Sequence, residues 1–150
     1  MTTELIVFIV LAVTTFYSNG VQAYIHFEAY PLIPLVGKQE FVPYLNEYER
    51  RLPIALLLPY ALTVISNIIL LFIRPNNLSL VTMIVALVLN LAVTVVTVVL
   101  ATPVYNRIKQ NGQALPGEMK KLIGINVLRL LLSTISSGVV IYMLVALLPG

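Results

Sequence analysis

The sequence lacks cysteine, aspartate and tryptophan, and it contains a single histidine, His26. The absence of cysteine excludes disulfides, thiolate metal sites, thioether-linked haem and cysteine nucleophiles. With one histidine and no aspartate, one copy of the chain cannot form a Ser-His-Asp triad or a metal site of several histidines. Any chemistry must therefore use glutamate, arginine, tyrosine, asparagine or His26, and we expect neither a bound metal nor a cofactor.

Charged residues are also scarce. They make up 10% of the 150 residues, whereas hydrophobic residues make up 59% and are grouped in long blocks. A membrane-spanning helix needs about 20 predominantly apolar residues, and four blocks meet this length: 5–25, 52–73, 78–102 and 122–148. The sequence therefore predicts an all-α integral membrane four-helix bundle that forms a single domain over residues 1–150. We expect it in a bacterial inner membrane or a plasma membrane.

Basic residues are distributed unevenly between the expected connections. Arg74 is alone in the second connection, whereas the first and third hold most of the others: Lys38, Arg50, Arg51, Arg107, Lys109, Lys120 and Lys121. Because cytoplasmic loops are rich in lysine and arginine, we expect the first and third connections to be cytoplasmic and both termini to be extracytoplasmic. The net charge of +3 then reflects orientation and contact with membrane lipid, and we expect no nucleic-acid partner.

The first connection contains a segment with helical spacing. Pro43 fits the first turn of a helix with Glu40 just before it, because proline needs no hydrogen-bond partner there. Tyr44, Tyr48 and Arg51 then fall on one side of that helix. We predict a short interfacial helix that leads into the second span, and the alternative is an aromatic and basic belt at the lipid headgroups.

An arginine and an amide interrupt the fourth apolar block. Asn126 and Arg129 are three residues apart and share a helix face. An arginine at the centre of a membrane helix costs roughly 2.5 kcal/mol or more, so Arg129 must face a partner, a cavity or the bundle interior. No acid occurs in any expected span. We therefore expect the counter-ion to come from the first connection, with Glu47 as the first choice and Glu28 as the second.

Each expected span also carries one polar stripe at helical spacing. Counted from the predicted cytoplasmic ends at 1.5 Å per residue, the main polar side chains lie roughly 4–12 Å below the membrane surface. These candidate ligand-binding residues are Asn19, Gln22, Tyr60, Thr97, Asn126 and Arg129. A polar chamber in the cytoplasmic half, open toward His26 and Tyr105, explains their common depth.

Three motifs carry a resemblance to a known family. They are Phe41-x-x-Tyr44-x-x-x-Tyr48-x-x-Arg51, Thr102-Pro103-Val104-Tyr105-Asn106 after the third span, and Asn126-x-x-Arg129 in the fourth. Together they resemble the four-helix membrane family that includes the fungal anthrone oxygenases and many uncharacterised members. The resemblance implies a bundle with a polar intramembrane site and, in the oxygenase members, cofactor-independent oxidation of a polycyclic phenol.

Two classes of function follow from these observations. In the first, the chamber binds a small amphiphilic or anionic ligand, with Arg129 holding an anionic oxygen and Asn126 orienting it. His26, Glu28 and Tyr105 are then the candidates for proton transfer. In the second, the protein is a non-catalytic membrane subunit or lipid-binding partner whose polar stripes only set helix packing.

Two further alternatives remain open. Transport is a weaker class, because neither an inverted repeat nor paired broken helices is visible in the sequence. A homo-oligomer is compatible with the sequence, and two copies of His26 could then hold a haem between them. A lone histidine at a membrane surface more often contacts headgroups, so we expect no haem.

Overall fold

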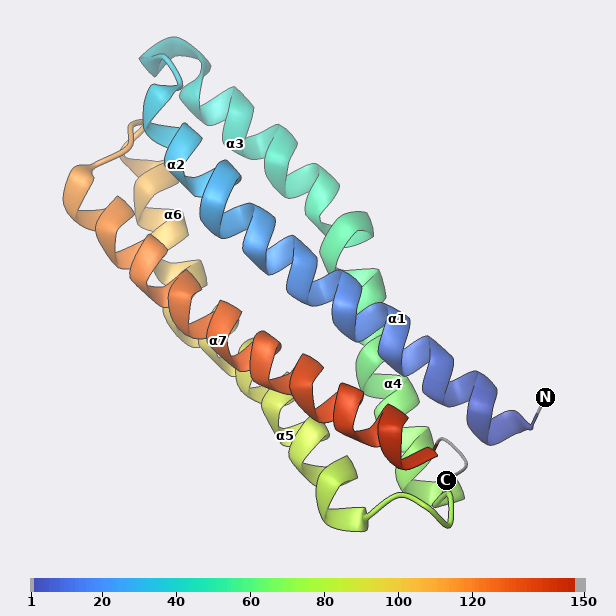
Figure 1. The fold of residues 1–150 in the computed structure, drawn as a ribbon. Coiled ribbons are helices and arrows are strands. Elements are labelled where there is room, and N and C mark those ends of the chain that lie inside the picture. Colours follow the sequence, from blue (N-terminus) through green and yellow to red (C-terminus); the bar gives the residue numbers. More distant parts are fainter. Residues whose placement is uncertain (1, 148–150) are drawn as a thin grey trace.

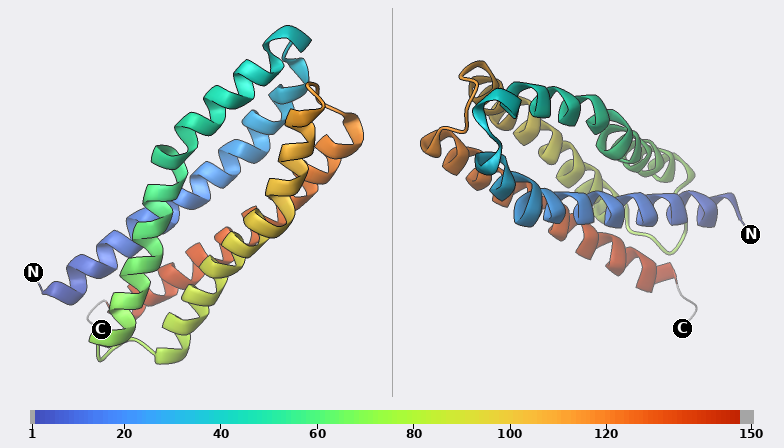
Figure 2. Two further views of the ribbon diagram at one scale, coloured as in Figure 1. Left: turned by 180° about the vertical axis from the view of Figure 1, so that it is seen from behind. Right: turned by 90° about the horizontal axis from the view of Figure 1, so that it is seen from above.

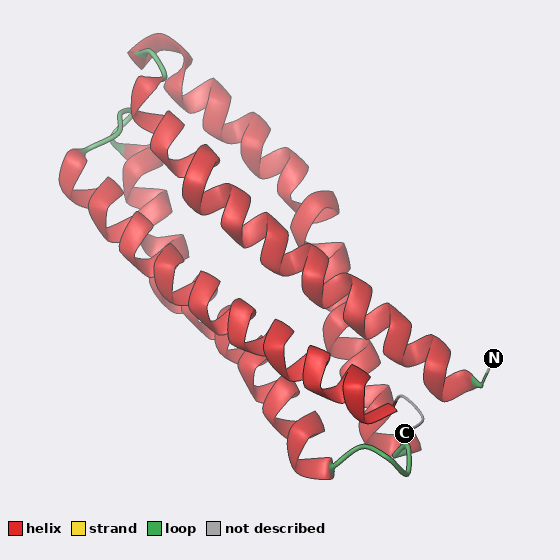
Figure 3. Ribbon diagram, in the orientation of Figure 1, coloured by secondary structure: helices red, strands yellow, loops and turns green. Residues whose placement is uncertain are grey.

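The computed structural model describes residues 2–147, and within them the chain is helical without any strand. Four helical rods are each long and apolar enough to cross a membrane: Thr3–Leu35, Lys38–Ile73, Leu80–Gln110 and Pro116–Leu147. They lie side by side as a bundle (Figures 1 and 3). The predicted all-α four-helix bundle is thereby confirmed, and the length and composition of its helices are compatible with a membrane bundle. Residue 148, the expected end of the last span, lies outside the described residues.

Three of the rods change helical type along their length. The first consists of α1 (Thr3–Tyr24), the π-helical η1 (Ile25–Ala29), α2 (Tyr30–Leu32) and the 3₁₀-helical η2 (Ile33–Leu35). The second consists of α3 (Lys38–Leu52), the π-helical η3 (Pro53–Leu57) and α4 (Leu58–Ile73). The third consists of α5 (Leu80–Val95), the π-helical η4 (Val96–Ala101) and α6 (Thr102–Gln110), and the fourth is α7 (Pro116–Leu147).

The rods form a closed ring. α1 packs on α4 and α7, and α5 packs on α7 and α4. A tight turn joins α4 to α5, and the two described ends of the chain lie at the same end of the bundle as this turn (Figure 2). Arg74 closes α4 in the left-handed conformation with φ 48°, and Pro75 after it cannot continue the helix. The expected antiparallel hairpin of the second and third spans is therefore present.

A polar layer at mid-length of the bundle lies between two buried apolar clusters. The cluster near the α4–α5 turn consists of Phe8, Leu11, Leu70, Leu78, Met83, Ala86, Val140 and Met143. The cluster at the opposite end consists of Ile25, Tyr30, Ile33, Phe41, Leu45, Ala101, Val104, Ile108, Met119 and Leu122. In every rod the buried polar residues come between the two clusters in sequence, and Arg129 is among them. Interhelical packing and hydrogen bonds hold such a layer together, because lipid provides little hydrophobic drive for helix association.

Prolines explain the π-helical stretches. In η1, η3 and η4 the closing backbone N–H donates to the carbonyl five residues earlier: Tyr30 to Ile25, Leu58 to Pro53 and Thr102 to Thr97. In each case the next residue is a proline: Pro31, Pro59 and Pro103. A proline ring clashes with the carbonyl four residues earlier, and the wider π turn gives it room. The helix continues past each proline.

This continuity corrects two expectations. The third helix does not end at Thr102-Pro103, because α6 carries it on to Gln110 and leaves only residues 111–115 as the connection to α7. The helix expected to begin near Pro43 begins at Lys38, with Pro43 in its interior. It runs through η3 into α4 without a break, so it is the first part of the second rod, and its interfacial location stays a prediction.

Candidate functional site

Arg129 lies inside the bundle. On α7 it follows Asn126 and precedes Ser133 and Ser136 on one buried face, and only 3% of its surface is exposed. Its Nε is buried without a hydrogen-bond partner, and it forms no ion pair with any of residues 2–147. A buried charge without a partner is costly, so the cavities beside Arg129 are the natural place to look for its role.

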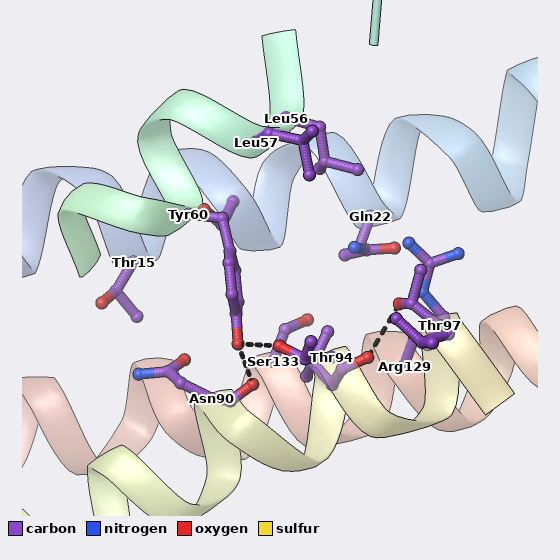
Figure 4. Close-up of a pocket in the computed structure, with 13 residues that line it drawn as sticks. Thr15, Gln22, Leu56, Leu57, Tyr60, Asn90, Thr94, Thr97, Arg129 and Ser133 are labelled. Atoms are coloured by element: carbon purple, nitrogen blue, oxygen red, sulfur yellow. Dashed lines mark hydrogen bonds between the residues drawn. The ribbon is translucent and has the colours of Figure 1, made fainter. Parts of the chain in front are cut away.

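The first cavity, here named the inner chamber, has a volume of about 110 Å³. It lies within the polar layer and receives side chains from all four rods (Figure 4). Its lining residues are Thr15, Ser18, Gln22, Leu56, Leu57, Tyr60, Asn90, Val93, Thr94, Thr97, Val98, Arg129 and Ser133. Hydroxyl and amide groups therefore alternate with apolar side chains around Arg129.

The second cavity, here named the vestibule, has a volume of about 240 Å³ and lies toward the connections that are expected to be cytoplasmic. Tyr30, Tyr48 and Tyr105 bring three phenol rings to it from the first, second and third rods. Leu56, Thr97 and Arg129 line both cavities. Arg129 is therefore the charged group at the junction between the inner chamber and the vestibule.

Polar atoms without a partner concentrate around the inner chamber. Of the seven buried side-chain atoms in residues 2–147 that lack a hydrogen-bond partner, five belong to its lining residues. They are Thr15 Oγ1, Ser18 Oγ, Gln22 Oε1, Asn90 Nδ2 and Arg129 Nε. Buried polar groups in proteins are rarely left without a partner, so this cluster marks a place suited to a polar guest.

Some chamber residues are fixed by the protein itself. The Tyr60 hydroxyl donates to the Asn90 backbone carbonyl and is also hydrogen-bonded to the Thr94 hydroxyl (Figure 4). The Thr97 hydroxyl donates to the Val93 carbonyl one turn earlier, at 2.7 Å. These bonds hold the α4 and α5 walls of the chamber, and they leave the Arg129 guanidinium free of them.

The predicted ligand-binding residues divide into two groups. Gln22, Tyr60, Thr97 and Arg129 line the inner chamber. Asn19 and Asn126 line neither cavity, because both are used between α1 and α7. The Asn19 side-chain oxygen accepts from Ser133 at 2.8 Å and from Thr134 at 3.1 Å, and the Asn126 amide donates to the Gln22 backbone carbonyl at 3.3 Å.

The candidates for proton transfer are also divided. Tyr105 lines the vestibule, and its hydroxyl donates to the Leu45 carbonyl at 3.4 Å. His26 lies edge-on to Phe27, with ring centroids 4.8 Å apart, and lines neither cavity. Glu28 is exposed and forms no ion pair within the described chain. The π turn η1 directs His26 and Glu28 away from the cavities that Tyr30 reaches.

The expected counter-ion is corrected by the structure. The Glu47 side chain is 42% exposed and accepts from Arg50 at 2.8 Å and Arg51 at 2.7 Å, on the outer face of α3. Glu28, the second choice, does not reach Arg129 either. The acid that lines the vestibule with Arg129 is Glu49, which is paired with Lys109 of α6. Arg50 and Arg51 follow Glu47 by three and four residues, so they share its helix face and pair with it on the outside of α3.

Comparisons with protein-family models, with curated proteins and with solved structures found no match. The resemblance to the family of the anthrone oxygenases therefore depends on the motifs alone. What the geometry defines is a four-helix bundle of membrane-spanning type, with a buried arginine between two connected cavities.

Proposed function

We propose that the protein binds a small amphiphilic anion in the membrane, with the anionic group on the Arg129 guanidinium. The observation that carries the proposal is the burial of Arg129 without any acidic partner among residues 2–147. Hydrogen bonds that involve a charged group contribute about 1.5–3 kcal/mol, and a carboxylate can accept two parallel hydrogen bonds from the guanidinium fork.

The lining of the chamber is partly polar and partly apolar, and it therefore favours an amphiphilic ligand over a fully charged solute. Gln22, Ser18 and Asn90 supply amide and hydroxyl groups that lack protein partners, while Leu56 and Val93 supply apolar contacts. Ligand cavities in proteins combine a mainly apolar lining with a few placed polar groups. A ligand with one charged end and one apolar end matches both kinds of surface.

The resemblance to anthrone oxygenases adds a candidate reaction, the oxidation of a phenol. A cavity of about 150 Å³ holds one benzene ring, and the inner chamber has about 110 Å³. A polycyclic phenol would therefore have to extend into the vestibule, where Tyr30, Tyr48 and Tyr105 lie. We propose binding as the function and include turnover of a phenol as a reaction to be assayed.

Thermal unfolding in the presence of benzoate tests the proposal. A ligand that binds only the folded state stabilises it by about 2.7 kcal/mol at 100 times its Kd, so benzoate should raise the unfolding temperature of the wild-type protein. Arg129→Met should abolish this response. Lys120→Met removes an exposed charge from the same helix and should preserve it. Equal benzoate responses of wild type and Arg129→Met would exclude this function.

A non-catalytic subunit is the second candidate function. It is favoured by the contacts that set helix register, namely Asn19 with Ser133 and Thr134, and Ser136 with Asn90 at 3.2 Å. These residues need no ligand to explain them. The benzoate experiment separates the candidates, because register alone gives no reason for an anion to stabilise the protein through Arg129.

We propose that the vestibule faces the cytoplasm and that both termini lie on the opposite side. The support is the excess of lysine and arginine in the first and third connections. Since the chain has no cysteine, single cysteines at Gln113 and Asn76 can be labelled without background. Gln113→Cys should react only from the cytoplasmic side and Asn76→Cys only from the other side. The reverse pattern would overturn the orientation while leaving the binding proposal intact.

A further inference from the structure

The second and third rods are joined by side chains at two separate levels. On the side of the α4–α5 turn, Tyr60 of α4 is hydrogen-bonded to Asn90 and Thr94 of α5. At the other end, Tyr105 of α6 donates to the Leu45 carbonyl of α3, and Lys109 pairs with Glu49. Between these two levels lie η3 and η4.

The stretch between the two levels is not sealed. The main contacts of η3 are with α3 and α4, its neighbours along the second rod, whereas η4 also packs on α7 of the fourth rod. There is no substantial packing between η3 and η4 in the described residues. Leu57 of η3 is 59% exposed and Val98 of η4 is 61% exposed, yet both line the inner chamber. Residues that belong to both the chamber and the outer surface mark an opening between them.

The outer surface around the opening is apolar, as a surface in contact with lipid hydrocarbon requires. Both rods are long enough to cross a membrane, and η3 and η4 lie inside them. Their outward neighbours are apolar: Ile54, Leu58, Val95 and Val99 are all exposed. Figure 4 shows Leu56 and Leu57 across the chamber from Thr94 and Thr97, so a molecule that passes between η3 and η4 comes from lipid and meets the chamber directly.

The size of the chamber restricts what can use this opening. About 110 Å³ is less than a cavity that holds benzene, so the chamber cannot enclose a long apolar molecule. A chain that extends through the opening needs no such enclosure, because its far end remains in lipid. Two acyl chains with a glycerol group exceed the space beside Arg129, whereas one chain with a carboxylate places only its charged end and first methylenes inside.

We propose that the opening between η3 and η4 is a lateral portal, and that the ligand is a single-chain carboxylate, a free fatty acid. Its carboxylate lies on Arg129, and its chain passes between Leu57 and Val98 into the bilayer. This inference rests on the proposed function, and it adds both the class of ligand and the route by which the ligand arrives. The tyrosines of the vestibule then face the carboxylate from the opposite side of Arg129.

The test uses the purified protein in lipid nanodiscs with a palmitate analogue that carries a diazirine at mid-chain. After irradiation, mass spectrometry maps the modified peptides. We expect labels in η3 and η4, on the segments 53–57 and 96–101, with competition by unlabelled palmitate. Labels spread evenly over the exposed apolar surface, without competition, would overturn the portal.

Bulky substitutions with matched controls test the route. Val98→Trp and Leu57→Trp fill the opening, and each should lower the competed labelling at least about tenfold, equivalent to losing one strong contact. Val99→Trp and Leu58→Trp place the same ring one residue away, at exposed positions that do not line the chamber, and should leave labelling unchanged. Unaltered labelling in both portal variants would contradict the route.

Benzoate binding separates the two levels of the account. Benzoate has no chain that must extend into lipid and can reach Arg129 through the vestibule. Its stabilising effect should therefore depend on Arg129 and be kept by Leu58→Trp and Val99→Trp, whose positions do not line the chamber. If benzoate binding depends on Arg129 but palmitate labelling is the same in wild type and in the two portal variants, the proposed function survives and the portal is wrong. If neither ligand depends on Arg129, the proposed function fails as well.

Discussion

Two interfaces between neighbouring rods, here called the α1–α7 seam and the η3–η4 seam, are built differently. Between α1 and α7, polar side chains form interhelical hydrogen bonds: the Asn19 side-chain oxygen accepts from Ser133 and Thr134, and the Asn126 amide donates to the Gln22 backbone carbonyl. Among the described residues no such bond joins η3 to η4, and the neighbouring chamber contains polar atoms without partners. The first arrangement holds helices in register, whereas the second leaves an opening beside a charge. A polar residue in a membrane helix therefore reveals its role only through its partners.

Leucine truncation should show the largest contrast. Leu45 and Leu57 both lie in the second rod, but Leu45 is fully buried in an apolar cluster and Leu57 lines the portal. Leu45→Ala should lower the free energy of unfolding by about 2 kcal/mol or more through the cavity it leaves, while Leu57→Ala should change it by less than about 0.5 kcal/mol. Steric trapping or denaturant unfolding in micelles measures both. Similar losses would mean that the η3–η4 seam is packed.

Neighbouring residues on α1 provide a finer comparison. Asn19→Ala removes two interhelical hydrogen bonds, each of which contributes about 0.6 kcal/mol on average in a membrane protein, so a loss of about 1 kcal/mol is expected. Ser18→Ala removes a hydroxyl that has no partner and should be neutral or slightly stabilising. Unfolding of the two variants side by side checks this. A Ser18 loss equal to the Asn19 loss would show that Ser18 takes part in packing.

The smallest effect is expected at the ion pair that closes the loop end of the η3–η4 seam. Glu49 and Lys109 are partly exposed, and such pairs contribute less than about 1 kcal/mol. Glu49→Gln should therefore barely change stability, but it should increase labelling of the vestibule by water-soluble probes.

In a double-mutant cycle with Arg129→Met, Glu47→Gln should show no coupling, because Glu47 is paired with Arg50 and Arg51. A clear coupling of Glu47 to Arg129 would restore it as the counter-ion.

The bundle was predictable because block hydropathy determines how many helices can span a bilayer. The polar stripes were predictable where the helices are regular: Gln22, Tyr60 and Arg129 lie in α1, α4 and α7. Thr97 lies at the beginning of η4 and keeps the stripe that Asn90 and Thr94 begin in α5. The same counting of helical positions also assigned Asn19 and Asn126 to the chamber, although neither residue lines it. Sequence spacing places a side chain on a face, but it does not tell whether a neighbouring helix already satisfies it.

The rest of the site could not be predicted because π turns change the register. Tyr30 follows η1, and Tyr48 and Glu49 are separated from Tyr60 by η3, so a helical wheel drawn through these stretches assigns them to wrong faces. The available signal was the X-Pro pair that directly follows each π turn: Tyr30-Pro31, Leu58-Pro59 and Thr102-Pro103. Read as π turns inside continuing helices, these pairs would have extended the third helix and brought Tyr30 to the site.

Substitutions of Arg129 and Asn126 should affect stability and the response to anions in opposite ways. A buried charge without an acidic partner destabilises the unliganded protein, because its desolvation is not compensated. Arg129→Met should therefore raise the stability of the free protein while removing its response to anions. Asn126→Leu removes the hydrogen bond between α7 and the Gln22 carbonyl of α1, so it should lower stability by about 1 kcal/mol and keep that response. Unfolding scans with and without benzoate measure both effects.

The most direct measurement is the ¹⁵Nε resonance of Arg129 in protein labelled at arginine and titrated with benzoate. Arg129→Lys identifies the signal by difference. Because Arg129 Nε is buried without a hydrogen-bond partner, we predict a saturable shift of this resonance alone, with those of Arg50, Arg51, Arg74 and Arg107 unchanged. An Arg129 signal that does not move, or one that moves only together with the surface arginines, would contradict the account.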